Sequence, residues 1–456
     1  MRFTGDYRER KRCYIKYEDN FMHKLKKLFP QSIKNIYHLA QAILANVIFG
    51  FPPRKIRIIG VTGTDGKTTT VQMIAKILEE SGKKVAMAST INFKIDGVEE
   101  KNLSHFTTES SFAVQKFIKK AVSVGCEYLV LETSSHSLDQ YRVWGVDFDV
   151  ALITNVTREH LDYHGTMEKY RQAKRMLFEN VAKNKGTIVV NLGMENPEEF
   201  LDFEVGNKFG YCVDEDIKEK FSNEKINIIQ AEKIEVSISS SNFLINNEVF
   251  TLSIPGEFNV ENALAATCVG LGEGFGLETI KEALTKIRGV PGRLERVENT
   301  RGINILVDFA LTPEALKRLY EMIAQTKKET SKIIAVFGSC GDRDKGKRPI
   351  MGKIVSEIAD FVILTNDEPY HEKPEQIIAE IFAGIENKKA CPAREGENVW
   401  KITDRRLAIR KALEIAAPDD VIAVTGMGNF ETMVVGDKKI PWNDRQVIEE
   451  ELQKLT

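Results

Sequence analysis

The sequence predicts a mixed α/β protein with two units, each built around a mostly parallel sheet. Short β-branched runs alternate with amphipathic helical patterns over residues 56–182, which is typical of a sheet covered by helices on both faces. The alternation resumes after Gly289-Val-Pro-Gly292 and indicates a second, doubly wound unit. The length of 456 residues suits two or three domains. We expect a short helical N-terminal region at 1–52, a central domain at 53–290 and a Rossmann-like C-terminal domain at 291–456.

The elements follow in order from Pro52-Pro53, which ends a preceding helix. Parallel strands are predicted at 56–62, 85–89, 128–132 and 150–155, and helices at 68–81, 110–125 and 167–182. Residues 197–255 change character and predict an antiparallel side sheet, with strands at 225–230, 234–238 and 242–252 and a turn at Asn246-Asn247. A helical stretch covers 260–287. The second unit is predicted to have strands at 303–308, 333–337, 361–365 and 421–425, and helices from 312 and over 350–358, 374–385 and 404–416.

The N-terminal region contains one apolar segment, residues 33–51. It is too polar and too short to span a bilayer, but its apolar residues recur at helical spacing: Ile36, Leu39, Ala40, Ile43, Leu44, Val47 and Ile48. We expect this face to pack on the central domain. The alternative is a helix that lies on a membrane surface, helped by Lys24, Lys26 and Lys27. The packed helix is the favoured interpretation.

Composition narrows the class of protein. The net charge is −2 and the basic residues are dispersed after the N-terminus, so no nucleic-acid partner is expected. The six cysteines form no C-x-x-C pair, which favours reduced, mostly buried thiols over disulfides or a zinc site. The charged N-terminus does not resemble a signal peptide. We expect a monomeric cytoplasmic enzyme.

A glycine-rich loop carries the clearest chemical signal. It follows the strand at 56–62, precedes the helix at 68–81, and reads Gly63-Thr-Asp-Gly-Lys-Thr-Thr69. In this order, backbone N–H groups and a helix N-terminus point to one place, where a polyphosphate binds. Lys67 supplies a cation for the phosphates, and the Thr68 hydroxyl is placed to ligate their magnesium ion. The sequence therefore predicts a P-loop ATPase domain with ATP contacts at Gly63, Thr64, Asp65, Gly66, Lys67, Thr68 and Thr69.

Further blocks resemble the Mur ligases, the amide-forming enzymes of peptidoglycan synthesis, and among them the MurE type. The ATP loop itself matches, as do six further blocks that begin at Leu131, Thr154, Tyr170, Pro255, Val336 and Asp404. The resemblance covers about residues 56–456. It implies an ATP-dependent ligase that transfers the γ-phosphate to a carboxylate, after which an amino-acid amine displaces phosphate from the acyl phosphate. The implied acceptor is a muramoyl-peptide-like molecule and the implied pathway is cell-wall synthesis.

The resemblance also implies a catalytic set that binds two Mg²⁺ ions. Glu132 and His160 match metal ligands of the family, beside Thr68. Lys174, in Tyr-Arg-Gln-Ala-Lys, matches a lysine that the family carries as a carbamate, which gives it a carboxylate on a long arm. Lys67, Glu132, His160 and Lys174 are therefore the expected catalytic residues. His164 has no such support and is assigned a structural role.

Substrate contacts are implied in the same way. Thr107, Thr108, Ser134, Gln140 and Arg142 match positions that hold the muramoyl-peptide. Asn262 matches the adenine contact, and Arg293 and Asp308 match further nucleotide contacts. The polar loop after the strand at 333–337 is expected to face the same cleft with Gly338, Asp342, Arg343, Lys345 and Arg348.

The sequence departs from the family pattern in three places. About fifty mostly helical residues stand where the family has a longer uridine-binding domain, so recognition of the acceptor chiefly through its muramoyl-peptide end is expected. Leu311 replaces a histidine. The amino-acid-selecting Asp-Asn-Pro-Arg motif of diaminopimelate-adding enzymes reads Asp367-Glu-Pro-Tyr370, and the neighbouring loop reads Gly426-Met-Gly-Asn-Phe-Glu431.

That third departure predicts the charge of the added amino acid. The arginine that would bind a distal carboxylate is absent, and Glu368 adds a negative charge. Because a buried anion without a partner is costly, a cationic end such as that of lysine or ornithine is expected over diaminopimelate. The pocket is assigned to Asp367, Glu368, Tyr370, Gly426 and Glu431.

Two alternatives remain open. Within the same fold, an archaeal pseudomurein peptide ligase or a folylpolyglutamate-synthase-like enzyme would share the activation chemistry. From another class, a catalytically silent nucleotide-binding scaffold is possible, although a scaffold has no use for the complete set of Lys67, Thr68, Glu132, His160 and Lys174.

Overall fold

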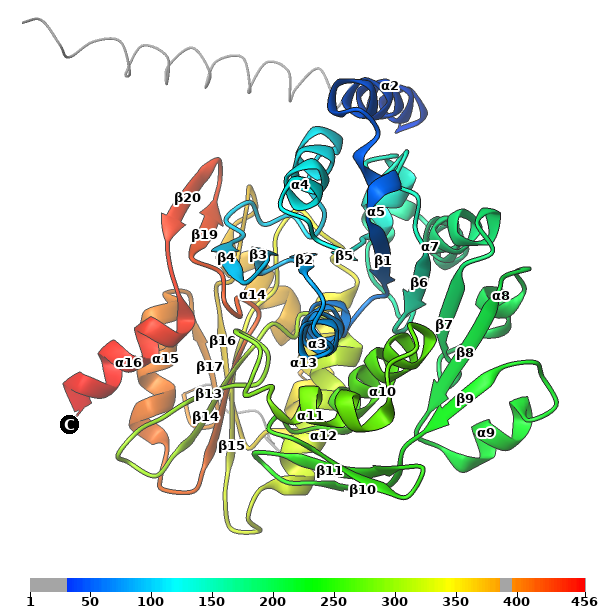
Figure 1. Ribbon diagram of the computed structural model, residues 1–456. Helices are drawn as coiled ribbons and strands as arrows, with labels where there is room; N and C mark the ends of the chain where they lie inside the picture. Colours follow the sequence, from blue (N-terminus) through cyan, green and yellow to red (C-terminus); the bar gives the residue numbers. More distant parts are fainter. Residues whose placement is uncertain (1–30, 386–395, 456) are drawn as a thin grey trace, which may run out of the picture.

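The computed structural model describes residues 31–385 and 396–455 and shows a mixed α/β protein with two large sheets (Figure 1). The basic cluster Lys24, Lys26 and Lys27, and also Cys13 and Cys391, lie outside the described residues. The four described cysteines are free thiols, as predicted, and three of them are buried.

The first sheet has nine strands in the order β4-β3-β2-β5-β1-β6-β7-β8-β9, all parallel except at the β2-β3-β4 edge. Its strands are β1 (Arg57–Thr62), β2 (Val85–Ala88), β3 (Asn92–Ile95), β4 (Val98–Lys101), β5 (Tyr128–Glu132), β6 (Val150–Ile153), β7 (Thr187–Asn191), β8 (Asn207–Cys212) and β9 (Asn227–Gln230). Alternate residues of β1 belong to different cores, since Ile58 faces one side of the sheet and Ile59 the other. Burial on both faces explains the continuous apolar run of this strand.

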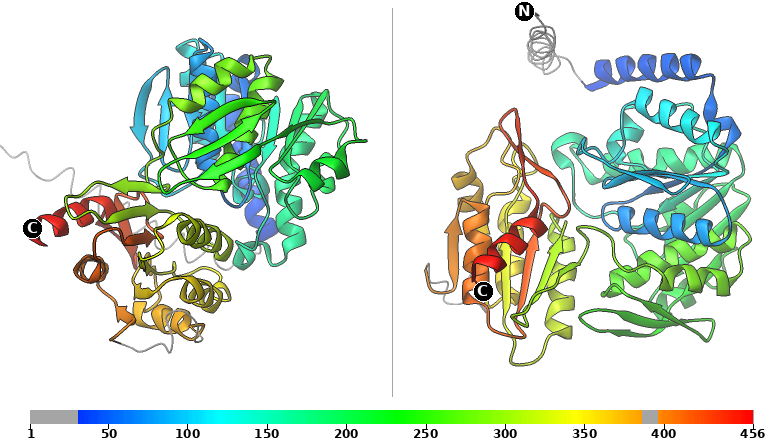
Figure 2. Two further views of the ribbon diagram at one scale, coloured as in Figure 1. Left: turned by 90° about the horizontal axis from the view of Figure 1, so that it is seen from below. Right: turned by 60° about the vertical axis from the view of Figure 1, so that its left-hand side comes forward.

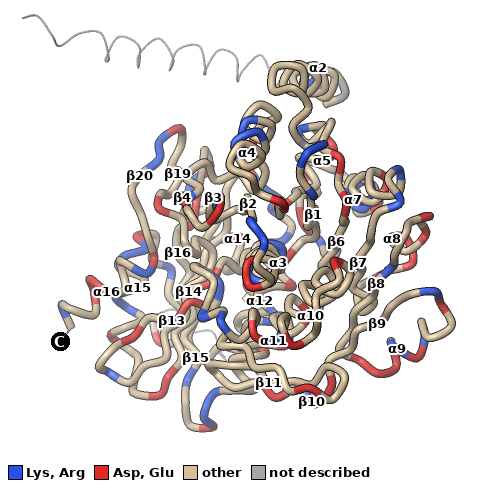
Figure 3. Tube along the Cα trace, in the orientation of Figure 1, with Lys and Arg blue, Asp and Glu red and all other residues tan. Residues whose placement is uncertain are grey.

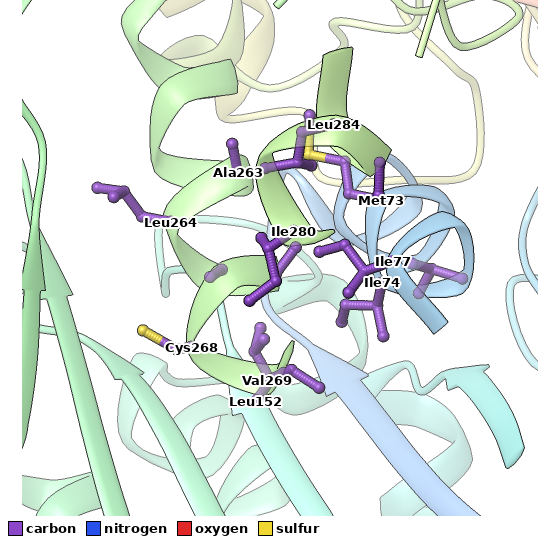
Figure 4. Close-up of a cluster of buried hydrophobic side chains, with 14 of the residues drawn as sticks. Met73, Ile74, Ile77, Leu152, Ala263, Leu264, Cys268, Val269, Ile280 and Leu284 are labelled. Carbon is purple, nitrogen blue, oxygen red and sulfur yellow. The ribbon is translucent and has the colours of Figure 1, made fainter. Parts of the chain in front are cut away.

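Helices cover both faces of this sheet. One face packs on α3 (Lys67–Glu80), α10 (Glu257–Gly272) and α11 (Leu277–Thr285), whose side chains interlock in the cluster of Figure 4. The other face packs chiefly on α4 (Ser111–Ser123) and α7 (Met167–Lys183). Short helices complete this half: η1 (Pro52–Lys55), α5 (Ser135–Asp139), α6 (Leu161–His164), α8 (Glu198–Leu201) and α9 (Glu215–Phe221).

The second sheet has six strands in the order β13-β14-β18-β15-β16-β17, with only β13 antiparallel. The strands are β13 (Glu295–Val297), β14 (Asn304–Asp308), β15 (Ile333–Phe337), β16 (Phe361–Thr365), β17 (Val399–Ile402) and β18 (Val421–Thr425). The helices are α12 (Pro313–Thr326), α13 (Lys347–Ile358), α14 (Pro374–Phe382), α15 (Arg405–Ile415) and α16 (Asp444–Leu455). A hairpin of β19 (Thr432–Val435) and β20 (Lys438–Pro441) extends beside the first sheet (Figures 1 and 2).

The side sheet is smaller than predicted. It contains β10 (Glu232–Val236), β11 (Ser241–Ile245) and β12 (Glu248–Leu252), and the turn at Asn246-Asn247 is where the sequence placed it. The predicted strand at 225–230 is instead β9, which pairs in parallel with β8 at the edge of the large sheet. The helical stretch predicted over 260–287 is two helices, because Gly274 adopts a left-handed φ of 84° between them.

The N-terminal helix α2 (Gln31–Phe49) packs against α4, as predicted, but not through the predicted face. Ile36, Leu44 and Val47 are more than half exposed, whereas Ala42, Ala45 and Asn46 are buried. The expectation that the apolar stripe faces the protein was therefore wrong. Among the described residues, no helix is long and apolar enough to cross a membrane.

Candidate functional site

One large cavity, with a volume of about 860 Å³, lies between the two large sheets. Its walls come from the carboxyl ends of β1, β5 and β6 on one side and of β14, β16 and β18 on the other. Ligands of open α/β sheets bind at this edge. The cavity therefore brings segments from both units to a common site.

The glycine-rich loop forms one wall. A side chain at Gly63 would overlap the Thr154 hydroxyl, and Gly66 has a left-handed φ of 82° directly before α3, so both positions need glycine. The Asn155 amide oxygen accepts from the backbone N–H groups of Thr64 (3.2 Å) and Asp65 (2.9 Å). Six of the seven predicted loop residues line the cavity, and Gly63 lies behind them: Thr64, Asp65, Gly66, Lys67, Thr68 and Thr69.

Two partly buried cations face this wall. Lys67 Nζ donates to the Thr64 carbonyl at 2.7 Å, and the Arg293 guanidinium lies 3.4 Å from the Thr68 hydroxyl and 4.2 Å from the centre of the Phe309 ring. Within the described residues, neither forms an ion pair with a carboxylate. Burial lowers the pKa of Lys67 and of Arg293. A bound polyphosphate would supply the missing negative charge.

Asp308 and Asn262 line the cavity as predicted but also shape its backbone. The Asp308 carboxylate accepts from the N–H groups of Leu294 and Ala310, each at 2.7 Å, and so fixes the chain around Arg293. Asn262 accepts from the Thr70 hydroxyl at 3.2 Å and its side chain lies against Gly66. Asn262 therefore contacts the phosphate loop, and the adenine contact stays a prediction.

Glu132 ends β5 at the cavity, beside Thr68. Its carboxylate accepts from the Thr68 hydroxyl at 3.0 Å, from the Thr90 N–H at 2.8 Å and from the Thr90 hydroxyl at 2.9 Å. These contacts hold a buried carboxylate and a hydroxyl together next to the phosphate loop. Oxygen ligands of this kind are those that Mg²⁺ prefers.

His160 also lines the cavity, at the start of α6. Its φ of 56° is unusual for a residue with a side chain, and such strain is concentrated at functional sites. The His136 ring lies 4.6 Å away, and burial lowers the pKa of His160 well below its usual range and that of His136 to about 3. Both imidazoles are thus neutral, which is the form that binds metal ions. His164 donates to or accepts from the Ser135 hydroxyl at 3.0 Å, in keeping with a structural role.

Lys174 is almost completely buried on α7, directly behind the phosphate loop. Its Nζ donates to the Gly63 carbonyl at 2.6 Å and lies 4.4 Å from the centre of the Tyr170 ring. Within the described residues it has no carboxylate ion-pair partner, and it does not line the cavity wall itself. Burial, reinforced by the charge of Lys67, lowers the pKa of Lys174 well below its usual range. Burial of this kind disfavours the charged form of the amine, whereas most helix lysines are solvated.

The residues predicted to hold the acceptor form a network at one end of the cavity. Thr107 lines the cavity and accepts from the Thr90 hydroxyl at 3.1 Å. Thr108 donates to the Glu132 carbonyl, and Arg142 donates to the Thr108 carbonyl (3.1 Å) and to Gln140 (2.9 Å). Ser134 accepts from the Ser137 N–H as the cap of α5. Of the five predicted residues, only Thr107 is on the cavity wall.

The loop before α13 differs from its prediction. Arg343 lines the cavity, but Gly338, Asp342, Lys345 and Arg348 do not. Arg348 is fully buried against Glu372 and Glu380, Lys345 pairs with Glu372, and Asp342 contacts His371. For Arg348 the physical reason is that α13 begins at residue 347, so that the side chains of Lys347 and Arg348 point in different directions. Asp342 and Lys345 precede the helix and are held by His371 and Glu372.

Lys347 occupies the place in the cavity that was expected for its neighbours. It forms an ion pair with Glu159 at 3.1 Å and donates to the Leu311 carbonyl at 2.9 Å, with both charged side chains buried. This pair joins the two halves of the molecule across the cavity. The sequence did not predict this pair, although Glu159 stands directly before His160 in the block that begins at Thr154.

The far wall carries four of the five residues assigned to the amino-acid pocket, Asp367, Glu368, Tyr370 and Gly426, whereas Glu431 is outside and pairs with Lys101. Glu368 is 3% exposed and accepts from the Val434 N–H at 3.2 Å. Its only ion-pair neighbour in the described chain is His105, at 3.2 Å, whose other ring nitrogen lies 2.7 Å from the Thr432 hydroxyl. His105 was not predicted. No motif in the sequence marked it.

Some of these side chains could hold a Mg²⁺ ion. Thr68 and Glu132 fit one Mg²⁺ site beside the phosphate loop. The described residues contain no group of three His, Cys, Asp or Glu side chains that could hold a metal ion unaided. Any metal bound here must therefore complete its coordination with substrate oxygens or water, as Mg²⁺ commonly does in phosphoryl-transfer sites.

Comparisons with known proteins identify the family. Residues 61–270 match the Mur ligase middle domain, and residues 292–428 match the Mur ligase, glutamate ligase domain. A UDP-N-acetylmuramoyl-L-alanyl-D-glutamate–2,6-diaminopimelate ligase of Clostridium botulinum is 40% identical over 420 residues, which cover 91% of this chain and 82% of that protein. The chain belongs to the Mur ligase family.

Two further matches support the MurE type of Mur ligase. A UDP-N-acetylmuramyl-tripeptide synthetase of Roseiflexus is 37% identical over 89% of this chain and 80% of its own length. A solved structure of a UDP-N-acetylmuramoyl-L-alanyl-D-glutamate–2,6-diaminopimelate ligase superimposes with a TM-score of 0.55 and 29% identity, over 88% of this chain and 79% of that one. The protein is a MurE-type, ATP-dependent peptide ligase, which the comparisons favour over the alternatives named above. Mur ligases use ATP with Mg²⁺.

Proposed function

We propose that this Mur ligase joins an amino acid with a cationic side chain to the carboxylate of a muramoyl-peptide acceptor, in the cavity between the two sheets. One observation carries this proposal: the phosphate loop with Glu132 and the acidic Glu368 face the same 860 Å³ space from opposite walls. ATP at the first wall and the amino acid at the second would then meet the acceptor between them.

The chemistry needs charge neutralisation more than it needs a protein nucleophile. A carboxylate oxygen attacks the γ-phosphorus, the bond to ADP breaks, and the amine then displaces phosphate from the acyl phosphate and loses a proton. Lys67, Arg293 and the N–H groups at the start of α3 are placed to offset the charge of the phosphates. Mg²⁺, when bound, would draw the phosphate and carboxylate oxygens together.

We assign Thr68 and Glu132 to one Mg²⁺ ion and His160 to a second. Lys174 is assigned as a carbamate, formed when its neutral amine adds to carbon dioxide and releases a proton. Two facts support this assignment: the Lys174 amine is buried without a carboxylate partner, and it lies against the carbonyl of Gly63 in the phosphate loop. A carbamate would add the oxygen ligand that the second site lacks.

The amino-acid preference rests on Glu368. In the described chain this buried carboxylate has no lysine or arginine partner, so an incoming ammonium group would neutralise it. The relatives are named for 2,6-diaminopimelate, whose distal end also bears a carboxylate. That group would be brought toward Glu368, which disfavours it here. Lysine and ornithine fit the pocket better on this argument.

The test is phosphate release from ATP, measured with and without a UDP-muramoyl-dipeptide acceptor and each amino acid in turn, followed by the mass of the product. The proposal predicts release only when acceptor and amino acid are both present, and a product heavier by one amino-acid residue. Steady ATP hydrolysis without any ligated product would contradict it.

A further inference from the structure

The helix α2 presents its two faces in the reverse of the usual arrangement. A surface helix normally turns its apolar stripe toward the protein and its polar side chains toward water. In α2 the side facing the protein carries small and polar residues, among them Asn35, Ala42 and Asn46, and the outer side is apolar.

The outer face is a continuous apolar stripe along the whole helix. It consists of Ile33, Ile36, Tyr37, Ile43, Leu44, Val47 and Ile48, which are between 42% and 69% exposed. They are three, four or seven residues apart, with the exposed Ala40 between Tyr37 and Ile43, and this spacing keeps them on one side of the helix. An exposed apolar surface of this extent usually marks an interaction site.

Specific contacts hold α2 in this orientation. Asn46 is fully buried and donates to the Trp144 carbonyl at 2.9 Å, and a side chain at Gly145 would collide with it. At the other end, Gln31 donates to the Tyr163 hydroxyl at 2.9 Å and Asn35 to Asp139 at 3.2 Å. The helix is therefore fixed at both ends with its apolar stripe outward, and it lies at the outside of the molecule (Figures 1 and 2).

The surroundings of the outer face are basic. The helix has no acidic residue and carries Lys34, and the neighbouring α4 exposes Lys116, Lys119 and Lys120. Figure 3 shows blue segments along α4. Lys119 lies 5.8 Å from the centre of the Phe49 ring at the end of α2. Acidic neighbours offset part of this charge, since Lys120 lies 3.8 Å from Glu100 and Arg54 lies 3.7 Å from Asp147. Residues 1–30, which precede the helix, contain nine Lys and Arg against four Asp and Glu.

We propose that α2 docks this enzyme on an anionic membrane surface, with the outer face inserted among the lipids and the lysines beside the headgroups. Helices with an apolar face and flanking basic residues bind membranes in this way, without spanning them. The docking surface is separate from the cavity and does not depend on the identity of the amino acid.

A second copy of the chain fits the outer face less well. The stripe is about 28 Å long and about 10 Å wide, or roughly 300 Å². A stable dimer buries about 800 Å² on each partner. A symmetric contact through α2 would also bring the lysines of both copies together. Size and charge both favour a lipid surface.

The experiment is flotation of the full chain with vesicles of phosphatidylcholine alone or of phosphatidylcholine with phosphatidylglycerol, at low and at physiological salt. The protein should float with the anionic vesicles, less so at higher salt, and should not float with the neutral ones. The variant Ile36→Asp, Val47→Asp should reduce partition at least about tenfold. Replacing Lys116 and Lys119 by Gln should weaken it about fivefold for each lysine.

The matched control is Val249→Asp, Leu407→Asp, which replaces two exposed apolar residues (63% and 46%) on β12 and α15, elements that pack on other parts of the molecule. It should float like the unmodified protein, and all variants should keep their circular dichroism and their ligase activity in solution. Three results would overturn the proposal: no flotation at low salt, flotation that the Ile36, Val47 variant retains, or a dimer in solution that this variant dissociates. Flotation that arises only after removal of residues 1–30 would show that the chain itself covers the face, and would also overturn it.

Discussion

The two walls of the cavity were built by different means. The wall formed by the glycine-rich loop, called the phosphate wall, is shaped by its backbone. Glycines stand at fixed positions, Asn155 holds two N–H groups, and the N-terminus of α3 faces the cavity. The opposite wall, which carries Asp367, Glu368 and Tyr370 and is called the amino-acid wall, depends on a side-chain pair, Glu368 with His105. The first kind of site can be recognised in a short contiguous motif. The second depends on partners far apart in the sequence.

The difference has a consequence for specificity. The phosphate wall is proposed to bind ATP, which Mur ligases share, and its loop matches the family pattern. The amino-acid wall is where the chain departs from the family pattern, at Glu368 and Tyr370. Substitutions at the phosphate wall should therefore abolish turnover, whereas substitutions at the amino-acid wall should change which amino acid is used.

The largest effect is expected from Lys67→Ala. Loss of this partly buried cation removes charge neutralisation at the phosphates and should lower the rate of phosphate release about 10³-fold, with an unchanged melting temperature. Lys76→Ala is the matched control, since Lys76 lies on the same helix and pairs at the surface with Glu80. If Lys67→Ala kept full activity, the proposal that this wall binds the phosphates of ATP would be wrong.

Lys174→Ala tests the carbamate. It should lower the ligation rate on the order of 10²-fold, and added formate or acetate should restore part of the rate by supplying a carboxylate in the space of the side chain. Lys169→Ala, an exposed lysine on the same helix, should behave like the unmodified protein. An active Lys174→Ala, or an inactive one that no short acid rescues at any concentration, would count against the carbamate.

The pair between Lys347 and Glu159 should be important for stability. Lys347→Met leaves Glu159 buried without its counterion, which should lower the free energy of unfolding by about 3 kcal/mol in urea denaturation. Lys345→Met removes an exposed partner of Glu372 and should cost about 0.5 kcal/mol or less. Equal losses in the two variants would show that the buried pair has no special role.

Asp367 gives the amino-acid wall a pH dependence. Burial raises the pKa of Asp367 to about 7, above its value of about 3.9 in an unfolded chain. Between these values the folded state holds a proton that the unfolded state has released, so stability falls as pH rises. Asp367→Asn removes this loss, and its advantage in urea denaturation should grow by on the order of 2 to 4 kcal/mol from pH 5 to pH 8. The exposed Asp202→Asn should show no such trend.

Local motifs predicted the parts of the fold and site that depend on nearby residues. They include the phosphate loop, Glu132 at the end of β5 and most strands of both sheets. Each of these features depends on residues that are close together in the sequence. The pairing of β9 with β8 was not predictable in this way, since an isolated strand pattern does not identify its neighbour.

Orientation was the harder problem. Each residue of a helix is turned by about 100° from the one before, so a helix predicted to start at 350, when α13 starts at 347, gave no sign that Lys347 and not Arg348 faces the cavity. In α2 the periodicity identified the apolar stripe correctly but gave no sign of which side faces the protein. That side is decided by Asn46, Gly145 and the other contacts with distant segments.

The most direct test of the account is a competition in which lysine and diaminopimelate are supplied together and the two products are counted by mass. Glu368 predicts that the unmodified protein incorporates lysine in preference. Glu368→Asn with Tyr370→Arg should shift the ratio toward diaminopimelate by about 1 to 3 kcal/mol, or roughly 5- to 150-fold, whereas Glu431→Gln outside the cavity should leave it unchanged. If the unmodified protein uses diaminopimelate at least as well as lysine or ornithine, the charge of Glu368 does not select the amino acid and the account of this wall is wrong.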